Sequence, residues 1–258
     1  MQNNTFPTLF IGQNLITLPR VDSTNNYLKN LLSKSEPLPE GTVIMADEQF
    51  AGRGQQQNTW HAEPGKNLTI SILLKPTFLP LEKQFLLNMA ISIAINNALK
   101  VFVKEQVKIK WPNDIYYQNK KIGGVLIENT IVGSLIKNTV VGIGLNVNQQ
   151  TFLGDLSTRA TSLTQILQQD VNLHQLLSEI CSQIESLYLK LKAGNYTFLT
   201  ITYVDNLYKI NETALYRQNG EVFEGIIKGV SETGILKLER EGFLQAYNFK
   251  EIEFLNHV

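Results

Sequence analysis

The sequence is poor in the side chains that build disulfides and metal sites. Its 258 residues include one cysteine, Cys181, and three histidines that are far apart in the chain. A single cysteine excludes an intrachain disulfide framework and a cysteine-based zinc cluster. Cys181 has apolar neighbours in a segment predicted to be helical, so we expect it in the core. We therefore expect no metal site made of these side chains.

The chain also lacks a surplus of either charge and the usual targeting signals. It has 23 basic and 23 acidic side chains, and its formal net charge is zero. A dedicated nucleic-acid-binding protein normally carries a basic surplus. No apolar run approaches the roughly 20 residues that span a membrane, and no basic start followed by an apolar stretch indicates a signal peptide. These absences predict a cytoplasmic protein with neither a nucleic-acid nor a membrane partner.

With 43% apolar residues, the composition is that of a globular protein, and the apolar patterns predict an α/β domain over 1–206. Strands are predicted at 42–46, 68–74, 107–111, 115–117, 124–128 and 140–147. Helices are predicted after the polar run 22–26 and at 82–103, 173–191 and 197–203. Beyond residue 206, four short strands with turn-forming pairs between them predict a small β-barrel over 207–258. Those strands are expected at 214–216, 222–230, 235–238 and 243–249.

A long polar segment, 49–67, separates two of these strands and contains Gly52-Arg53-Gly54. Glycines let backbone N–H groups approach an anion, and arginine adds a forked cation for phosphate or carboxylate. The segment is not a dinucleotide-binding loop, because Gln57 replaces the last glycine and no helix follows. The alternative is a flexible glycine turn with a solvated arginine.

Two further segments, 110–114 (KWPND) and 120–128 (KKIGGVLIE), combine lysines with turn-forming or small residues. Pro112 favours an extended residue before it, which presents Asn113 and Asp114 at the end of a strand. A lysine that leads into a glycine-rich strand can place an ammonium group over a ligand. The alternatives are a Pro-Asn-Asp turn and a lysine-rich hairpin with a glycine bulge.

Small residues alternate in the segment 142–148 (GIGLNVN), which leaves room on one sheet face for a flat ligand. The alternative is close packing of a helix on the sheet. The run Ser23-Thr24-Asn25 begins a predicted helix, and we expect at least one of the three to cap it.

Taken in this order, the motifs resemble the catalytic region of the biotin protein ligases, also called biotin–[carboxylase] ligases. The resemblance rests on Trp60 and on VDSTN (21–25), EQFAGRG (48–54), PGKNL (64–68), KWPNDI (110–115), KKIGGVLIE (120–128) and GIGLNVN (142–148). It implies a mixed-sheet α/β (α+β) catalytic domain like that of class II aminoacyl-tRNA synthetases, followed by a small SH3-like barrel. It also implies the catalytic-only form, because a VDSTN motif at Val21 leaves no room for an N-terminal DNA-binding domain.

The resemblance implies an AMP-forming C–N ligase. Such an enzyme makes biotinyl-5′-AMP from biotin and Mg-ATP, releases pyrophosphate, and passes biotin to a lysine of a carboxylase's biotin carboxyl carrier domain. ATP, Mg²⁺ and biotin would be substrates, with no tightly bound cofactor, and a homodimer is an option. One alternative is a lipoyl or octanoyl ligase or transferase of the same fold. A second is a protein that sequesters biotin without transferring it.

Site residues follow from the resemblance position by position. Biotin is expected to contact Ser23, Thr24, Asn25, Gln49, Gly52, Arg53, Lys121, Gly124, Gly142 and Gly144. The nucleotide and the adenylate are expected to contact Arg53, Gly54, Gln55, Trp60, Lys110, Asn113, Lys121 and Asn146. Arg53 and Lys121 are catalytic candidates because a carboxylate must approach an α-phosphate, and two anions repel. Asp114 is a candidate to orient the acceptor lysine or to take its proton. Trp60 is expected to lie against the adenine.

The chain departs from the family at Gln55-Gln56-Gln57, since the family commonly has Arg at the middle position and Gly at the last. This loses a cation and a hinge from the loop expected to cover the intermediate. We therefore expect faster release of the adenylate, unless a Lys or Arg elsewhere compensates.

Restoring both residues tests this expectation. Gln56→Arg combined with Gln57→Gly should slow the dissociation of biotinyl-5′-AMP severalfold, because a cation and a flexible hinge return to the loop. The measurement is the adenylate release rate in rapid-mixing experiments. An unchanged release rate would contradict the expectation.

Overall fold

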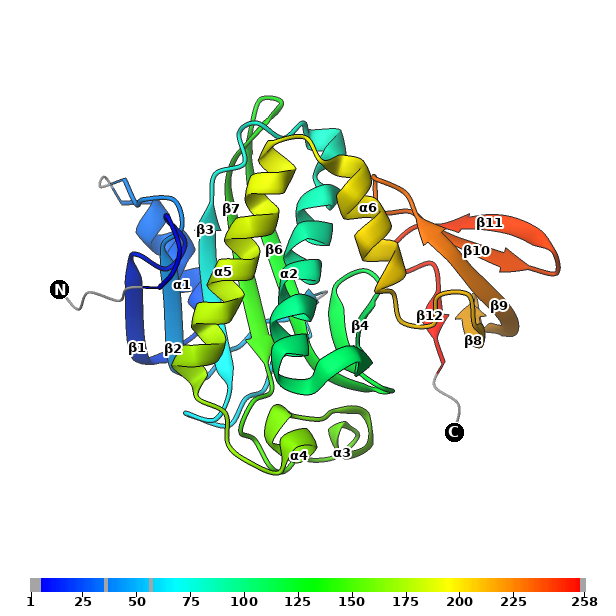
Figure 1. The fold of residues 1–258 in the computed structure, drawn as a ribbon, viewed down its shortest axis with the longest axis horizontal. Coiled ribbons are helices and arrows are strands. Elements are labelled where there is room, and N and C mark those ends of the chain that lie inside the picture. The colour runs from blue at the N-terminus through cyan, green and yellow to red at the C-terminus, as the bar shows by residue number, and fades with distance from the viewer. Residues whose placement is uncertain (1–5, 35–36, 56–57, 256–258) are drawn as a thin grey trace.

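A seven-stranded mixed sheet forms the centre of the larger domain (Figure 1). The protein is described by a computed structural model over residues 6–34, 37–55 and 58–255. The sheet order is β1-β2-β3-β7-β6-β5-β4; β1 runs parallel to β2, and the other neighbours are antiparallel. The strands are β1 (Leu15–Val21), β2 (Val43–Gln49), β3 (Leu68–Leu74), β4 (Val107–Lys110), β5 (Asp114–Tyr117), β6 (Lys120–Val132) and β7 (Leu135–Leu145).

Helices cover the two faces of this sheet unequally. The helices are α1 (Thr24–Leu32), α2 (Phe85–Val103), α3 (Leu156–Arg159), α4 (Leu163–Leu167), α5 (Leu173–Lys192) and α6 (Tyr196–Asp205). Helices α2, α5 and α6 pack together over one face (Figure 1). Helix α1 packs on the opposite face, where Leu28 joins Ile44, Leu73 and Val140 in a separate small cluster. Alternate residues of the central strands therefore face two different environments.

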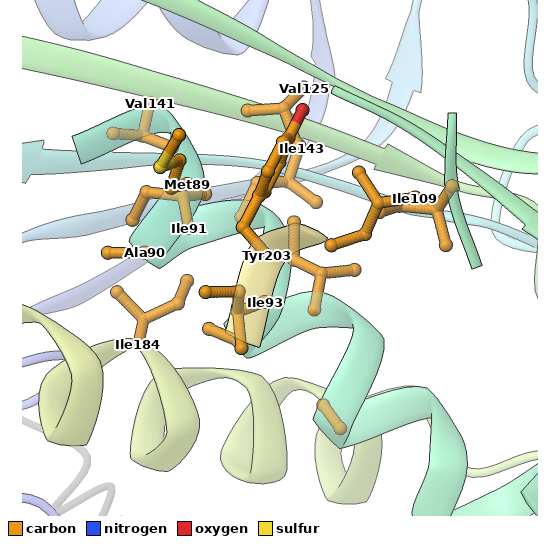
Figure 2. Close-up of a cluster of buried hydrophobic side chains, with 14 of the residues drawn as sticks. Met89, Ala90, Ile91, Ile93, Ile109, Val125, Val141, Ile143, Ile184 and Tyr203 are labelled. Carbon is orange, nitrogen blue, oxygen red and sulfur yellow. The ribbon is translucent and has the colours of Figure 1, made fainter. Parts of the chain in front are cut away.

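Helix α2 is apolar around nearly its whole circumference because it lies inside the larger domain. Figure 2 shows Met89, Ile91 and Ile93 of this helix among side chains of the sheet, with Tyr203 of α6 beside them. Apolar residues on every side are typical of a buried helix. By length and composition alone, the 23-residue segment Leu81–Val103 could cross a membrane, so the expectation that no segment approaches this length is wrong. Of its most apolar stretch, 72% is buried in the protein.

The C-terminal part of the chain forms a second, antiparallel sheet. Its strands are β8 (Thr213–Gln218), β9 (Glu221–Val230), β10 (Leu236–Arg240), β11 (Phe243–Tyr247) and β12 (Glu253–Phe254), in the order β11-β10-β9-β8-β12. Asn219 and Gly220 both have positive φ angles, 49° and 86°, at the β8–β9 turn, as expected for a tight hairpin. The predicted class, a mixed-sheet α/β domain followed by a small β-domain, is confirmed.

Several expectations about individual elements need correction. Strand β1 was not expected, because Pro19 interrupts its pattern of apolar residues. The strand forms nevertheless, since it lies at the edge of the sheet, where proline is tolerated. Strand β12 and the short helices α3 and α4 were not expected either. Ser23 stands at the N-cap of α1, but none of the expected residues caps the helix through its side chain. The side chains of Thr24 and Asn25 bond to other parts of the protein instead.

The two parts of the chain are joined at the edge of the large sheet. Residue 109 pairs with Leu207 in a parallel bridge, and the Tyr208 amide donates to the Ile109 carbonyl at 2.8 Å. The first residues after α6 are therefore attached to β4. A domain boundary at 206/207 stays a prediction.

The lone cysteine is a core residue, as expected. Cys181 is fully buried in α5, and burial raises the pKa of its thiol to about 12. A thiol with such a pKa stays protonated and unreactive at neutral pH.

The Tyr203 hydroxyl anchors the turn between β4 and β5, and this can be tested. It donates to the Pro112 carbonyl at 2.6 Å, which also accepts from Asn88 at 2.9 Å. Tyr203→Phe should lower the free energy of unfolding by about 1 kcal/mol, because one buried hydrogen bond is lost. Urea denaturation measures this. The control is Tyr27→Phe, whose phenol makes no hydrogen bond to the described part of the chain; an equal loss in both variants would contradict the assignment.

Candidate functional site

A cavity of about 1090 Å³ opens on the sheet face that carries α1 and extends to the C-terminal β-domain. Its walls come from α1, the segment after β2, the β4–β5 turn, β6, β7, α3 and residues 249–255. All the site residues expected from the sequence line it, except Gly52 and Asn146. Single pockets for small molecules commonly measure about 300–1,000 Å³, so this cavity has room for two ligands side by side.

One end of the cavity contains a continuous chain of polar side chains. Gln49 Oε1 accepts from the amide of Thr24 at 2.8 Å and lies 3.0 Å from its hydroxyl. The Ser71 hydroxyl donates to Asn25 Oδ1 at 2.5 Å and lies 2.7 Å from Thr24 Oγ1. These groups can donate to and accept from a small polar ring. Ser71, on β3, does not line the cavity but supports Thr24 and Asn25 from behind, and the sequence analysis missed it.

The carboxylate of Glu128, on β6, gathers three donors from two other segments. It accepts from Lys29 at 2.9 Å and from Asn25 at 2.8 Å, and it forms an ion pair with Arg53 at 2.5 Å. Burial raises the pKa of Glu128, but the hydrogen bonds from Lys29, Arg53 and Asn25 lower it by more, so it lies below its ordinary value. Glu128 thus fixes a cation expected to face the substrates. From the sequence, Glu128 was expected only to belong to a motif, and no role was assigned to its side chain.

Glycines in β6 and β7 make space for side chains of the site. A side chain at Gly142 would collide with the amide of Asn25, so the alternative of helix packing applies at this position. A Cβ at Gly144 would lie 2.5 Å from the Trp60 ring, and one at Gly124 would lie 3.0 Å from Asp114. At both positions the space is taken by side chains of the protein, so room for a flat ligand beside these glycines stays a prediction.

The segment from Gly52 to Trp60 folds back on itself. The Trp60 amide donates to the Gly52 carbonyl at 2.9 Å, and the Gly54 amide donates to the Asn58 carbonyl at 2.7 Å. The Gly54 N–H is therefore not directed at an anion, contrary to expectation. Gly52 does not line the cavity; a Cβ there would collide with the Trp60 carbonyl. The expected effect of Gln56 and Gln57 on adenylate release falls outside the described residues.

Lysines and the expected base meet at the turn between β4 and β5. Lys121 Nζ lies 2.6 Å from Asp114 Oδ1, so this carboxylate is paired rather than free. Lys110 donates to the Tyr116 hydroxyl at 3.1 Å. Burial is the main cause of the lowered pKa of Lys110, and the cations Lys121 and Arg159 lower it further, while Asp114 acts in the opposite direction.

The two asparagines expected near the nucleotide hold the backbone together. The Asn113 amide donates to the Val125 carbonyl at 3.0 Å, and the Asn146 amide donates to the Thr161 carbonyl at 3.1 Å. Asn113 still borders the cavity, but Asn146 does not. The side-chain amide of Asn146 serves one carbonyl of the backbone, and its expected contact with the nucleotide stays a prediction.

The C-terminal β-domain closes one side of the cavity, which the sequence did not reveal. The Trp111 indole N–H donates to the Gly234 carbonyl of this domain at 3.0 Å. Phe254 contributes its ring, 5.2 Å from the Lys110 ammonium. No local pattern could have indicated these contacts, because they join segments more than a hundred residues apart.

The cavity is positively charged although the chain as a whole is neutral. Six of its lining residues are cationic and only two, Asp114 and Glu253, are anionic. The cations are Arg53, Lys110, Lys121, Arg159, Arg217 and Lys250. Such a lining favours ligands with several negative charges.

The Glu128 cluster gives a prediction for stability against pH. Because its pKa is lowered in the folded protein, Glu128 stabilises the fold fully above its ordinary pKa of 4.5, and this is lost as the pH falls through the lowered value. Glu128→Gln should cost about 1–2 kcal/mol at neutral pH, and the difference from wild type should shrink in acid. Urea unfolding at several pH values measures it.

The matched control is Glu48→Gln, which removes a more exposed carboxylate paired with Arg20 at 3.1 Å. This change should cost well under about 1 kcal/mol at every pH. A pH-independent difference for Glu128→Gln would show that its charge does not stabilise the fold.

Comparison with known proteins agrees with this geometry. Residues 17–146 match the biotin/lipoate A/B protein ligase family. The bifunctional ligase/repressor BirA of Bacillus spizizenii is 30% identical over 244 residues, which cover 93% of this chain and 74% of that protein. A biotin--[acetyl-CoA-carboxylase] ligase of Paracoccus denitrificans is 24% identical over 242 residues, which cover 92% and 99%.

A solved structure extends the likeness to the whole fold. The biotin protein ligase from Aquifex aeolicus, in complex with biotin and ATP, superposes with a TM-score of 0.80 at 27% identity, covering 95% of this chain and 99% of that one. The matched region contains most of the cavity-lining residues, and the chain belongs to the biotin/lipoate A/B protein ligase family.

Proposed function

We propose that this protein is an ATP-dependent biotin–protein ligase. It activates biotin as biotinyl-5′-AMP and transfers it to a lysine of a biotin carboxyl carrier domain. The observation that carries the proposal is one cavity that joins the polar chain of Thr24 and Gln49 to the cations Arg53 and Lys121. The names of the relatives and the biotin and ATP bound in the Aquifex structure support it.

The first step would use the cations of the cavity. A carboxylate oxygen of biotin attacks the α-phosphorus of ATP, the P–O bond to the β-phosphate breaks, and pyrophosphate leaves. Attacking and leaving groups are both anionic, so catalysis depends on positioned cations. Lys121 lines the cavity with its ammonium group at the β4–β5 turn, and Arg53 is held from behind by Glu128.

The second step would use Asp114. The neutral amine of the acceptor lysine attacks the acyl carbon, the C–O bond to AMP breaks, and one proton leaves the nitrogen. Asp114 is paired with Lys121. When an anionic ligand draws the Lys121 ammonium toward itself, the carboxylate becomes available to take that proton.

Three finer statements belong to the same proposal. Mg²⁺ enters the cavity with the phosphates of ATP, as part of that substrate. The protein works in the cytoplasm and has no membrane partner. Its zero net charge favours the absence of a nucleic-acid partner as well. A homodimer is proposed on the ground that β1 leaves one edge of the large sheet open to pairing.

Intact-mass measurement tests the function. The protein is incubated with biotin, Mg-ATP and a carrier domain, and the carrier should gain the mass of one biotin. Lys121→Met should lower the rate of adenylate formation by about a hundredfold or more, because a cation that stabilises the transition state is lost. Gain with lipoate alone would indicate a lipoyl ligase, and tight biotin binding without any gain would indicate a sequestering protein; each result would overturn the proposal.

A further inference from the structure

Aromatic side chains gather where the cavity meets the C-terminal β-domain. Trp111 follows β4 and Tyr116 lies on β5, whereas Phe249 and Phe254 belong to the β-domain, and all four line the cavity. The rings of Trp111 and Phe249 have their centres 5.9 Å apart and cross at 72°. We call the surface formed by these four residues the aromatic slot. Neither chemical step of the proposed function needs these rings for its own sake.

A lysine side chain of the protein itself lies against the aromatic slot. The Lys110 ammonium is 4.9 Å from the centre of the Tyr116 ring and 5.2 Å from that of the Phe254 ring. It also donates to the Tyr116 hydroxyl at 3.1 Å. Aromatic rings suit lysine because their faces attract a cation and their apolar bodies cover the methylene stem. The slot therefore has the surface chemistry that a second lysine side chain requires.

The surroundings of the slot favour the uncharged form of an amine. Burial lowers the pKa of Lys110, and the cations Lys121 and Arg159 lower it further. The carboxylates Asp114 and Glu253 act in the opposite direction without reversing the shift. An amine that enters beside Lys110 meets the same burial and, in addition, the charge of Lys110. It therefore loses its proton more readily than in water, and only a neutral amine can attack an acyl group.

A depression on the β-domain adjoins this side of the cavity. It has a volume of about 590 Å³ and is lined in part by the β8–β9 turn. Arg217, Lys250 and Glu253 line both the depression and the main cavity, so the two are neighbours. An acceptor lysine belongs to another protein and must reach the cavity from solvent. The depression provides an approach on the side where the aromatic slot lies.

We propose that the aromatic slot receives the side chain of the acceptor lysine, with Tyr116 and Phe254 against its methylene stem. The inference rests on the proposed function, which supplies the acyl group and the acceptor. Asp114 and Tyr116 stand two residues apart on β5, and both line the cavity, so a lysine in the slot has its amine near the carboxylate. The nitrogen bonds to the acyl carbon, the C–O bond to AMP breaks, and Asp114 takes the proton.

Single-turnover kinetics with the whole protein tests the slot. Protein loaded with biotinyl-5′-AMP is mixed either with a carrier domain or with hydroxylamine, a small nucleophile without a methylene stem. Phe254→Ala should slow transfer to the carrier by about tenfold, because one wall of the slot is lost. The rate of adenylate formation and the reaction with hydroxylamine should stay at wild-type values. Phe254→Leu should recover part of the loss, since an apolar wall returns.

Two further variants complete the test. The matched control is Phe243→Ala, which removes an exposed ring on β11 of the same domain, outside the set of cavity-lining residues, and should leave every rate unchanged. Phe249→Ala removes a half-exposed ring of the slot and should act in the same direction as Phe254→Ala, so the inference stays testable if Phe254→Ala does not fold.

The outcomes separate this inference from the proposed function. If the wild-type protein transfers biotin and the slot variants transfer it equally fast, or lose as much rate with hydroxylamine as with the carrier, the inference is overturned alone. Slower adenylate formation with a raised KM for ATP would assign the slot to the nucleotide and overturn it as well. A wild-type protein that makes no adenylate would overturn the proposed function and this inference together.

Discussion

The site depends on one carboxylate that holds together segments far apart in the chain. Glu128 lies in the middle of β6, and its oxygens bind Arg53 from the segment after β2 and Lys29 and Asn25 from α1. A partly buried carboxylate is costly unless donors surround it, and here three donors lower its pKa despite the partial burial. The same bonds that make this carboxylate tolerable fix the orientation of the arginine that faces the cavity.

The polar chain continues from there to Gln49, the last residue of β2. Asn25 bonds to Glu128 with its amide nitrogen and accepts from Ser71 with its oxygen. Ser71 in turn meets Thr24, whose amide bonds to Gln49. Side chains from α1, β2, β3 and β6 are thereby positioned by one another. A connected network of this kind costs little to maintain when every member is satisfied, and it is rigid for the same reason.

The sequence predicted the fold class and many of the residues that line the cavity, because both follow from local signals. Buried strands such as Leu68–Leu74 appear as apolar runs, and the expected residues come from motifs whose order along the chain is informative. What could not be predicted depends on distant contacts. Asn146 has the amide expected of a ligand-binding residue, but that amide donates to the Thr161 carbonyl. The Gly54 N–H was expected to approach an anion, but it donates to the Asn58 carbonyl instead. Arg159 stands outside every motif and reaches the cavity only because Ala160 pairs with Lys121.

The turn between β4 and β5 has a consequence for the cooperativity of the molecule. Its Pro112 carbonyl is held by α2 and α6, and its Trp111 indole is bonded to the β-domain at Gly234. The same turn carries Asp114 to the cavity, so ligand binding, the seating of the helices and the docking of the small domain share one short segment. By thermodynamic linkage, a ligand that favours the ordered turn also raises the free energy needed to detach the β-domain. Conversely, detaching that domain lowers the affinity for the ligand by an equal factor. The small domain is thus part of the binding equilibrium, even where it touches no ligand.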